Sequence, residues 1–332
     1  MAIYRCNACG YVSEETATAV GQKVACGRCG QASTVYGTVF FIEKLIERYA
    51  AAMRELQALR AADDGATADE AAAPSQQALA GMEVDVTSRN FATPEQHLPL
   101  RAWFAARKME PTFDYSAVDT SGFFDDAARM LAARLDLFAE LIDRVTYAYR
   151  KSHTWINLEL ARLPQKDAQA INRLCRELYG HTFFSRYHYQ KPEKIVRLTL
   201  QTAPAVRRFF DGGWLEWCAL LEALEALKAA RKPDFSCARS VKVTFSNDDV
   251  HELDVVVLPA GRAPICIECK SGEFRRDIDK MLRLRKRLGL ERQNFIVCAA
   301  DLSNEQAAGL SAMYELTFLN LAQLRTHIQA LL

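Results

Sequence analysis

The stretch that decides the fold is 251–272, which reads HELDVVVLPAGRAPICIECKSG. Two apolar runs flank the turn sequence PAGR, so the stretch predicts two β-strands joined by a tight connection. Asp254 stands at the head of the first apolar run, and Glu268 and Lys270 close the second. Charged side chains among apolar strand residues are costly unless they are paired or bound to a metal ion. The pattern therefore indicates a site for chemistry inside the sheet.

Glu268 and Lys270 are two residues apart, so their side chains leave the same face of a strand. A neighbouring strand can place the Asp254 carboxylate beside Glu268, and Mg²⁺ or Mn²⁺ would relieve the repulsion between the two carboxylates. Such a cation polarises a phosphodiester oxygen and acidifies a water molecule for attack on phosphorus. Lys270 would orient or deprotonate that water and help neutralise the pentavalent transition state.

Working outward, Gly212–Leu227 (GGWLEWCALLEALEAL) predicts a helix with Glu216 in its early turns, where it could complete the cation shell. A strand is expected over Ser240–Ser246, before the strands of His251–Leu258 and Ala263–Gly272. A basic helix (Phe274–Leu288), a buried strand (Asn294–Ala300), a helix from Asn304 and a last strand follow. The order predicts an α/β domain over 211–332 with a mixed central sheet flanked by helices.

A helix carrying Glu216, a strand carrying Asp254 and a Glu268-x-Lys270 strand resemble the PD-(D/E)xK nuclease superfamily, with its restriction-endonuclease-like fold. More narrowly, GGWLE, HELDVVVL and IECKSG resemble the C-terminal nuclease domain of CRISPR-associated ancillary nucleases that answer cyclic oligoadenylates. The resemblance covers about 210–321 and places Lys280 at that family's recurrent lysine. It implies a metal-dependent endonuclease acting on DNA, RNA or both, in bacterial antiviral defence.

Two features depart from that family. No Rossmann-like βαβ pattern precedes residue 210, so activation by a cyclic nucleotide does not carry over to this chain. His251 stands where the family usually has Asn, which leaves the metal ligands intact but changes their surroundings. The structural alternative is an ion pair of Glu268 with Lys270 beside a solvated Asp254. The functional alternative is a non-catalytic nucleic-acid-binding or scaffold protein with a degenerate nuclease fold.

Two basic segments could contact nucleic acid. Residues 275–292 hold eight Lys or Arg against three acids, directly after the Glu268-x-Lys270 strand. Residues 151–210 hold eleven Lys or Arg against four acids, with aromatic residues interleaved, most densely in HTFFSRYHYQKPEK (181–194). Cationic groups neutralise phosphates and exposed aromatic faces stack on bases, although the same aromatics could instead be core. The nucleic-acid-binding candidates are Lys280, Arg283, Arg275, Arg276, Arg186 and Lys191.

The N-terminus carries Cys6-x-x-Cys9 and Cys26-x-x-Cys29. Four thiolates in two tight turns suit tetrahedral zinc, and the spacing resembles that of zinc ribbons. Because cysteine fills all four positions, the zinc is expected to be structural. In contrast, Cys266 and Cys269 are three apart on a predicted strand, face opposite sides and cannot share one ion.

The 332 residues carry 42 Lys or Arg and 41 Asp or Glu, a formal net charge of +1, which excludes a global electrostatic footprint for nucleic acid. Without an apolar run long enough to cross a membrane or a signal peptide, a soluble, cytoplasmic protein is expected. The expected parts are a zinc ribbon (1–37), a helical stalk (38–61), a flexible linker (62–80), a mostly helical, partly basic domain (81–210) and the nuclease-like domain (211–332). The stalk or the nuclease domain could form a homodimer, and other defence proteins are possible partners.

Overall fold

The structure is a computed structural model that describes residues 2–6, 8–9, 11–38, 93–114, 122–232 and 234–332. The chain divides into two compact units, Met1–Ala78 and Leu79–Leu332. The predicted stalk helix from 39 onward, the linker at 62–80 and a dimer through the stalk lie outside the described residues. None of the described helices is both long and apolar enough to cross a membrane.

The first unit holds a four-stranded antiparallel sheet in the order β2-β1-β4-β3. Its strands are β1 (Ala2–Arg5), β2 (Val12–Glu15), β3 (Lys23–Ala25) and β4 (Ala32–Gly37). Tyr4, Cys6, Cys26 and Val35 form its small buried cluster. So few apolar side chains bury little surface, so a unit of this kind depends on an additional cross-link such as a metal ion.

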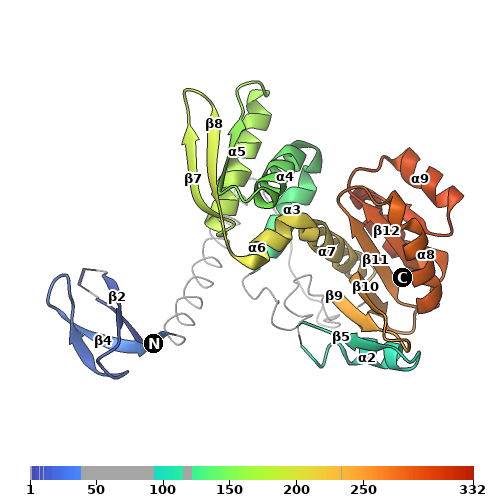
Figure 1. The fold of residues 1–332 in the computed structure, drawn as a ribbon, viewed down its shortest axis with the longest axis horizontal. Coiled ribbons are helices and arrows are strands. Elements are labelled where there is room, and N and C mark those ends of the chain that lie inside the picture. The colour runs from blue at the N-terminus through green and yellow to red at the C-terminus, as the bar shows by residue number, and fades with distance from the viewer. Residues whose placement is uncertain (1, 7, 10, 39–92, 115–121, 233) are drawn as a thin grey trace, which may run out of the picture. The chain divides into compact units, whose positions relative to one another are not determined.

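The second unit is built on a six-stranded mixed sheet in the order β13-β12-β11-β10-β9-β5 (Figure 1). The strands are β5 (Glu110–Thr112), β9 (Phe235–Thr244), β10 (Val250–Pro259), β11 (Ile265–Lys270), β12 (Phe295–Ala299) and β13 (Thr317–Leu319). Strands β5, β9, β10 and β11 are antiparallel, whereas β11, β12 and β13 are parallel. The α/β class and the mixed sheet are as the sequence predicts.

Helices cover both faces of this sheet. Helix α7 (Trp214–Ala229) and helix α10 (Leu321–Leu331) pack on the face that includes Val255 and Ile267. The other face, which includes Val256 and Cys266, is covered by α2 (Leu98–Ala105), α8 (Ile278–Leu288) and α9 (Asn304–Met313). Strand β12 lies between the two layers, so all five of its residues are buried. Cys266 and Cys269 contact different cores, which confirms that they face opposite sides.

The middle region is mostly helical, as predicted, but it also contains a second sheet that was not predicted. Its helices are α3 (Phe123–Ala133), α4 (Leu135–Arg150), α5 (Gln165–Gly180) and the short α6 (Pro204–Arg208). Strands β6 (Trp155–Glu159), β7 (Phe184–Gln190) and β8 (Ile195–Leu200) form an antiparallel sheet in the order β6-β8-β7. A register shift between Phe184 and Arg186 interrupts the alternation in β7, which hides its period of two.

The sheet of the second unit also extends beyond the range expected for it. Strand β5 pairs with β9, and α2 packs on β9, although both come from residues assigned in sequence to the preceding domain. The short helical turns are η3 (Phe209–Gly213), η4 (Arg275–Asp277) and η5 (Arg292–Asn294). One continuous buried core runs from α3 through α7 to α10. The middle region and the sheet domain are therefore packed together on α7.

Candidate functional site

Two glycines position the start of α7. Gly212 has φ +118°, and a Cβ there would lie 3.3 Å from the Ser271 Oγ. A Cβ on Gly213 would lie only 2.8 Å from the backbone oxygen of Arg208, so a larger residue cannot be accommodated without movement. The chain thus turns sharply from η3 into α7 and passes close to the end of β11. Glu216 lies in the first turn of α7 as a result.

The pairing of β9 with β10 is interrupted at one position. Register partners run from Val250 with Thr244 to Pro259 with Phe235, except that Asp254 and Ser240 do not pair. Ser240 has φ +54°, a left-handed conformation that is strained for serine. The side-chain alternation changes here, because Leu253 packs on the α8 side whereas Val255 packs on the α7 side. Such strain is concentrated at functional sites in proteins.

Asp254, Glu268 and Lys270 come together beside this interruption. The Lys270 Nζ lies 3.2 Å from the Glu268 Oε2 and 4.0 Å from the Asp254 Oδ2. The backbone N–H of Cys269 donates to the Asp254 Oδ2 at 2.7 Å. Pairing of β10 with β11 starts at Val255 with Ile267, so one further step of this register sets Asp254 opposite Glu268. The chain therefore juxtaposes the two carboxylates and the lysine as the strand pattern predicts.

Glu216 reaches the same place from α7. Its Oε2 accepts hydrogen bonds from the Arg239 Nη1 at 3.0 Å and from the Ser240 Oγ at 3.1 Å. The Arg239 guanidinium stacks on the Trp217 ring, 4.3 Å from its centroid. Arg239 and Ser240 are not among the residues predicted for this site, although two polar residues between Ala238 and Val241 are the same kind of signal as Asp254.

The electrostatics of the four groups are coupled. Burial, and secondarily the charge of Asp254, raise the pKa of Glu268 to about 7, although Lys270 and Lys280 partly offset them. Burial also raises the pKa of Asp254, and burial together with the Asp254 charge raises that of Glu216. Burial lowers the pKa of Lys270, but the adjacent carboxylates outweigh it, so the net shift is upward and Lys270 remains an ammonium. The negative charges of this cluster are thus incompletely compensated.

Each carboxylate keeps one oxygen without a hydrogen-bond partner in the described part of the chain: Glu216 Oε1, Asp254 Oδ1 and Glu268 Oε1. The Glu268 Oε1 is also fully buried, and a buried acceptor without a partner is unfavourable. Oxygen atoms of this kind suit a hard divalent cation. Within the described residues, however, the only group of three or more potential ligand atoms all within 4.8 Å of one another is the cysteine cluster described below. The carboxylates are therefore more widely spread than a closed ion shell.

The predicted nucleic-acid contacts fall on separate surfaces. Arg275 and Arg276 lie in η4, and Lys280 and Arg283 lie in α8, all exposed. The charge of Lys280 acts on both Glu268 and His251, so Lys280 lies near the carboxylates. Arg275 is paired with Glu273 at 3.1 Å. Arg186 is exposed in β7, and Lys191 is exposed in the turn that follows it.

The aromatic residues interleaved among the basic residues of 151–210 are mostly core. Phe183, Phe184, Phe209 and Phe210 are each 1% exposed, so the interpretation of these residues as base-stacking groups is wrong. They pack edge-to-face or stacked on one another and fill the core between the second sheet and α7. Trp155 is different, because 61% of its surface is exposed.

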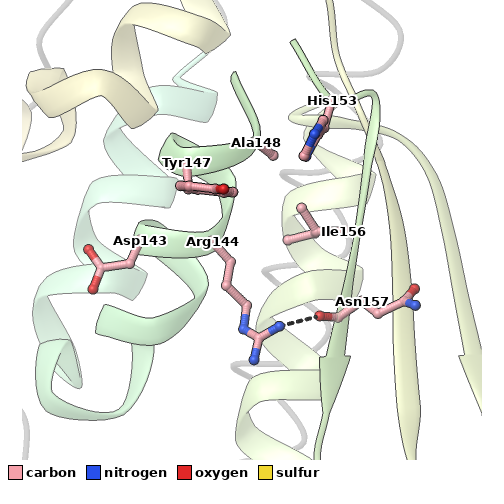
Figure 2. A pocket seen from close by; sticks show the side chains of 7 residues that line it. All are labelled: Asp143, Arg144, Tyr147, Ala148, His153, Ile156 and Asn157. Carbon is pink, nitrogen blue, oxygen red and sulfur yellow. Dashed lines mark hydrogen bonds between the residues drawn. The ribbon is translucent and has the colours of Figure 1, made fainter. Parts of the chain in front are cut away.

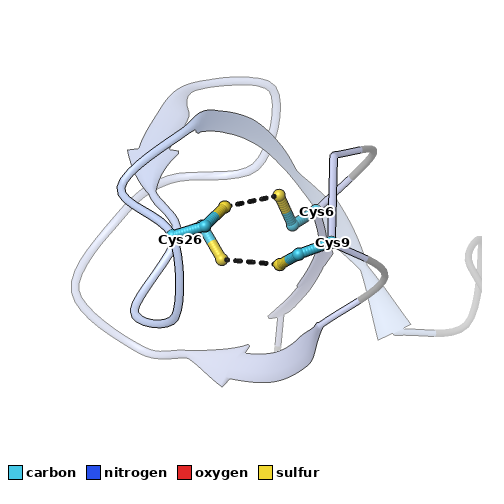
Figure 3. A group of neighbouring side chains, drawn as sticks. Cys6, Cys9 and Cys26 are labelled. Atoms are coloured by element: carbon cyan, nitrogen blue, oxygen red, sulfur yellow. Dashed lines mark hydrogen bonds between the residues drawn. The ribbon is translucent and has the colours of Figure 1, made fainter.

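The four N-terminal cysteines form one cluster (Figure 3). The Cys6 Sγ lies 3.5 Å from the Cys29 Sγ, and the Cys9 Sγ lies 3.7 Å from the Cys26 Sγ. Zinc–sulfur bonds of about 2.3 Å give a tetrahedron with edges of about 3.8 Å, which these separations approach. The cluster can therefore hold a metal ion.

The protonation of these thiols also fits a cation. The backbone N–H of Cys9 is the main cause that lowers the pKa of Cys6 to about 6. A hydrogen bond with the Gln31 backbone also lowers the pKa of Cys29, but the neighbouring cysteines together with burial outweigh it and raise that pKa to about 12. Four thiolates so close together repel one another, and a dication removes that repulsion.

A separate open pocket of about 330 Å³ lies between α4 and β6. Tyr147 and His153 line it, and the Arg144 Nη1 donates to the backbone oxygen of Asn157 at 3.2 Å across it (Figure 2). The pocket lining does not include Glu216, Asp254, Glu268 or Lys270. It is therefore not part of the same site.

No protein-family model matches the chain, and no curated protein matches it. Among solved structures, protein VC1899 from Vibrio cholerae is similar with a TM-score of 0.47 and 18% identity, over 70% of this chain and 59% of that one. Can2 from Sulfobacillus thermosulfidooxidans, in complex with cyclic tetra-adenylate (cA4), is similar with a TM-score of 0.48 and 14% identity, over 70% of this chain and 60% of that one. The matched part of each structure is thus about three fifths of its length.

Proposed function

We propose that this protein is a metal-dependent nuclease that hydrolyses phosphodiester bonds of DNA, RNA or both. The observation that carries the proposal is the meeting of Glu216, Asp254, Glu268 and Lys270 at one interruption of a central sheet, with a buried Glu268 oxygen lacking a partner. A purely structural ion pair would not need three carboxylates, and it would not leave one oxygen on each of them unpartnered.

The chemistry of the carboxylates suits Mg²⁺ or Mn²⁺, although their oxygens would have to move closer together to form a closed shell around the ion. Their second oxygens, on Glu216, Asp254 and Glu268, would hold the cation. When bound, the cation would activate water and withdraw charge from the scissile phosphate. The backbone N–H of Cys269 fixes the Asp254 side chain, so Asp254 presents its remaining oxygen without rearrangement.

Lys270 acts as a cation in this scheme. Its ammonium already contacts Glu268 and Asp254, and the upward shift of its pKa keeps it protonated at neutral pH. A charged donor beside the reacting phosphate stabilises the negative charge of the transition state and orients the attacking water. Lys280 and Arg283 on the neighbouring α8 would hold the substrate backbone.

The test is cleavage of a panel of labelled single- and double-stranded DNA and RNA by the full chain, with and without Mg²⁺ or Mn²⁺. We expect cleavage only with the cation, and loss of at least about a hundredfold in rate for Lys270→Ala and Glu268→Gln. The matched controls are Lys242→Ala, an exposed lysine on β9, and Glu222→Gln, on the same helix as Glu216 but paired with Arg325. Binding without cleavage by the parent protein would instead identify a non-catalytic nucleic-acid-binding protein.

The remaining parts of the proposal follow from the sequence. The cysteine cluster would bind a structural zinc ion in a zinc ribbon, because its four thiols leave no open coordination position. The proposal also includes the division into ribbon, stalk, linker, middle region and nuclease domain. It further includes a homodimer and a role in antiviral defence. The defence role is supported only by the motif resemblance.

A further inference from the structure

The sheet formed by β6, β8 and β7 has one packed face and one open face. Ile156, Leu158, Val196 and Leu198 point into the core, where α4 and α5 contact the sheet (Figure 1). Because side chains alternate, the residues between them point away from the helices. On this second side five side chains are exposed and the others are half-buried; the exposed ones are Trp155, Glu159, Arg186, His188 and Arg197.

The register sets these side chains in three rows. Trp155 pairs with Thr199, which pairs with Arg186. Asn157 pairs with Arg197, which pairs with His188. In the last row Glu159 pairs with Ile195, which pairs with Gln190. We call these nine residues the open face.

The open face carries cations without partners. Arg186 and Arg197 are diagonal neighbours across β7 and β8, a relation in which backbones are about 7–8 Å apart. Within the described chain, neither guanidinium makes a hydrogen bond or ion pair, whereas Arg134, Arg144 and Arg150 of the same region are each paired with an acid. Glu159, the one acid of the open face, is a diagonal neighbour of Arg197 across β6 and β8, but in the described chain it makes no ion pair with it. Two neighbouring arginines against one acid leave a net positive charge that attracts a polyanion.

Trp155 adds an aromatic surface to this charge. Its ring is 61% exposed and contacts no other ring of the described residues. It lies in the first row with Arg186 and next to the row of Arg197 and His188. An exposed indole beside cations matches a nucleobase beside its phosphates.

We propose that the open face binds single-stranded nucleic acid, with Arg186 and Arg197 on successive phosphates and Trp155 stacked on a base. A base face is accessible for stacking only when the base is not enclosed in a duplex, so this arrangement favours single strands. The open face is separate from the carboxylate site. The inference rests on the proposed nuclease function in one respect only, namely that the polyanion bound there is nucleic acid.

The test measures anisotropy of labelled single-stranded DNA and RNA 20-mers and of the matching duplexes with the full-length protein. The buffer contains no Mg²⁺ or Mn²⁺, so cleavage does not interfere. Trp155→Ala is expected to weaken single-strand binding at least about fivefold. Arg186→Ala with Arg197→Ala is expected to reduce the slope of log affinity against log salt by about 1.4, which is the loss of two phosphate contacts.

The controls are matched in residue type and exposure. Tyr147→Ala removes a 58% exposed aromatic ring that lines the α4–β6 pocket, and Arg176→Ala removes an exposed arginine of α5. Both are expected to bind as the parent does. Parent-like binding by Trp155→Ala and by the double arginine variant, or tighter binding of duplexes than of single strands, would overturn the inference.

Failure of the open-face proposal can be distinguished from failure of the nuclease proposal. Loss of cleavage in Lys270→Ala with unchanged anisotropy supports both proposals. Normal binding at the open face by a protein that never cleaves with Mg²⁺ or Mn²⁺ overturns the nuclease alone. Cleavage that is intact in a protein whose open-face variants bind normally overturns the open face alone.

Discussion

Replacing Glu268 with Gln should remove a pH-dependent cost to the stability of the metal-free protein. Burial and Asp254 raise the pKa of Glu268 from 4.5 to about 7. An acid with a raised pKa does not affect stability below pH 4.5, where it is protonated in both states. As the pH rises towards 7, the unfolded chain loses the proton first, so the folded state is progressively destabilised, and the cost is complete above pH 7.

The size of the effect follows from the two pKa values. At 1.36 kcal/mol per pKa unit, the carboxyl group destabilises the folded state by roughly 1 kcal/mol at pH 5 and by roughly 3 kcal/mol at pH 8. Glu268→Gln cannot ionise, so its stability relative to the parent should increase by roughly 2 kcal/mol between these two pH values.

Urea unfolding followed by tryptophan fluorescence measures this difference. All four tryptophans (Trp103, Trp155, Trp214 and Trp217) lie in the second unit, so the signal reports that unit and not the cysteine cluster. Glu222→Gln is the control, because its carboxylate pairs with Arg325 and lies outside the cluster. Equal pH profiles for Glu268→Gln and the parent would refute the reasoning. Millimolar Mn²⁺ should stabilise the parent at pH 8 and have less effect on Glu268→Gln.

Three further outcomes are expected. Arg239→Met removes the cation that pairs with Glu216, so the Mg²⁺ concentration for half-maximal cleavage should fall, by up to about tenfold; an increase would show that Arg239 is needed to position Glu216. Gly213→Ala places a Cβ 2.8 Å from the Arg208 oxygen, so urea unfolding should show a loss of about 1–3 kcal/mol, and the cleavage rate should fall with it. Cys26→Ser should abolish binding of one zinc per chain, measured by metal analysis, while the tryptophan-monitored unfolding of the second unit stays unchanged. Retained zinc would contradict the assignment of that cysteine.

Several features could be predicted from local patterns alone. The alternation of strand residues correctly placed Glu268 beside Lys270 and separated Cys266 from Cys269. The two Cys-x-x-Cys pairs predicted the cysteine cluster, because the spacing limits how two tight turns can present their thiols. These inferences held because they involve residues within a few positions of one another, where backbone geometry decides the direction of each side chain.

The second sheet could not be predicted in the same way. Strand β7 carries a register shift after Phe184, so its apolar residues do not follow a simple alternation. The phenylalanines beside the basic residues were interpreted as possible stacking groups, but they face the core. A phenylalanine that packs in the core and one that stacks on a base cannot be told apart from composition alone. Which face of a short strand is buried depends on the helices that pack against it, and these come from elsewhere in the chain.

The sequence by itself therefore determined the chemistry available to this protein: three acidic side chains and a lysine in apolar surroundings, and four thiols in two tight turns. Only the tertiary structure decided that Arg239 and Ser240 hold Glu216, that Asp254 lies where the pairing of β9 and β10 is interrupted, and that Trp155 remains exposed. The physical reason is that these features depend on contacts between elements distant in sequence. Local propensities do not predict such long-range contacts.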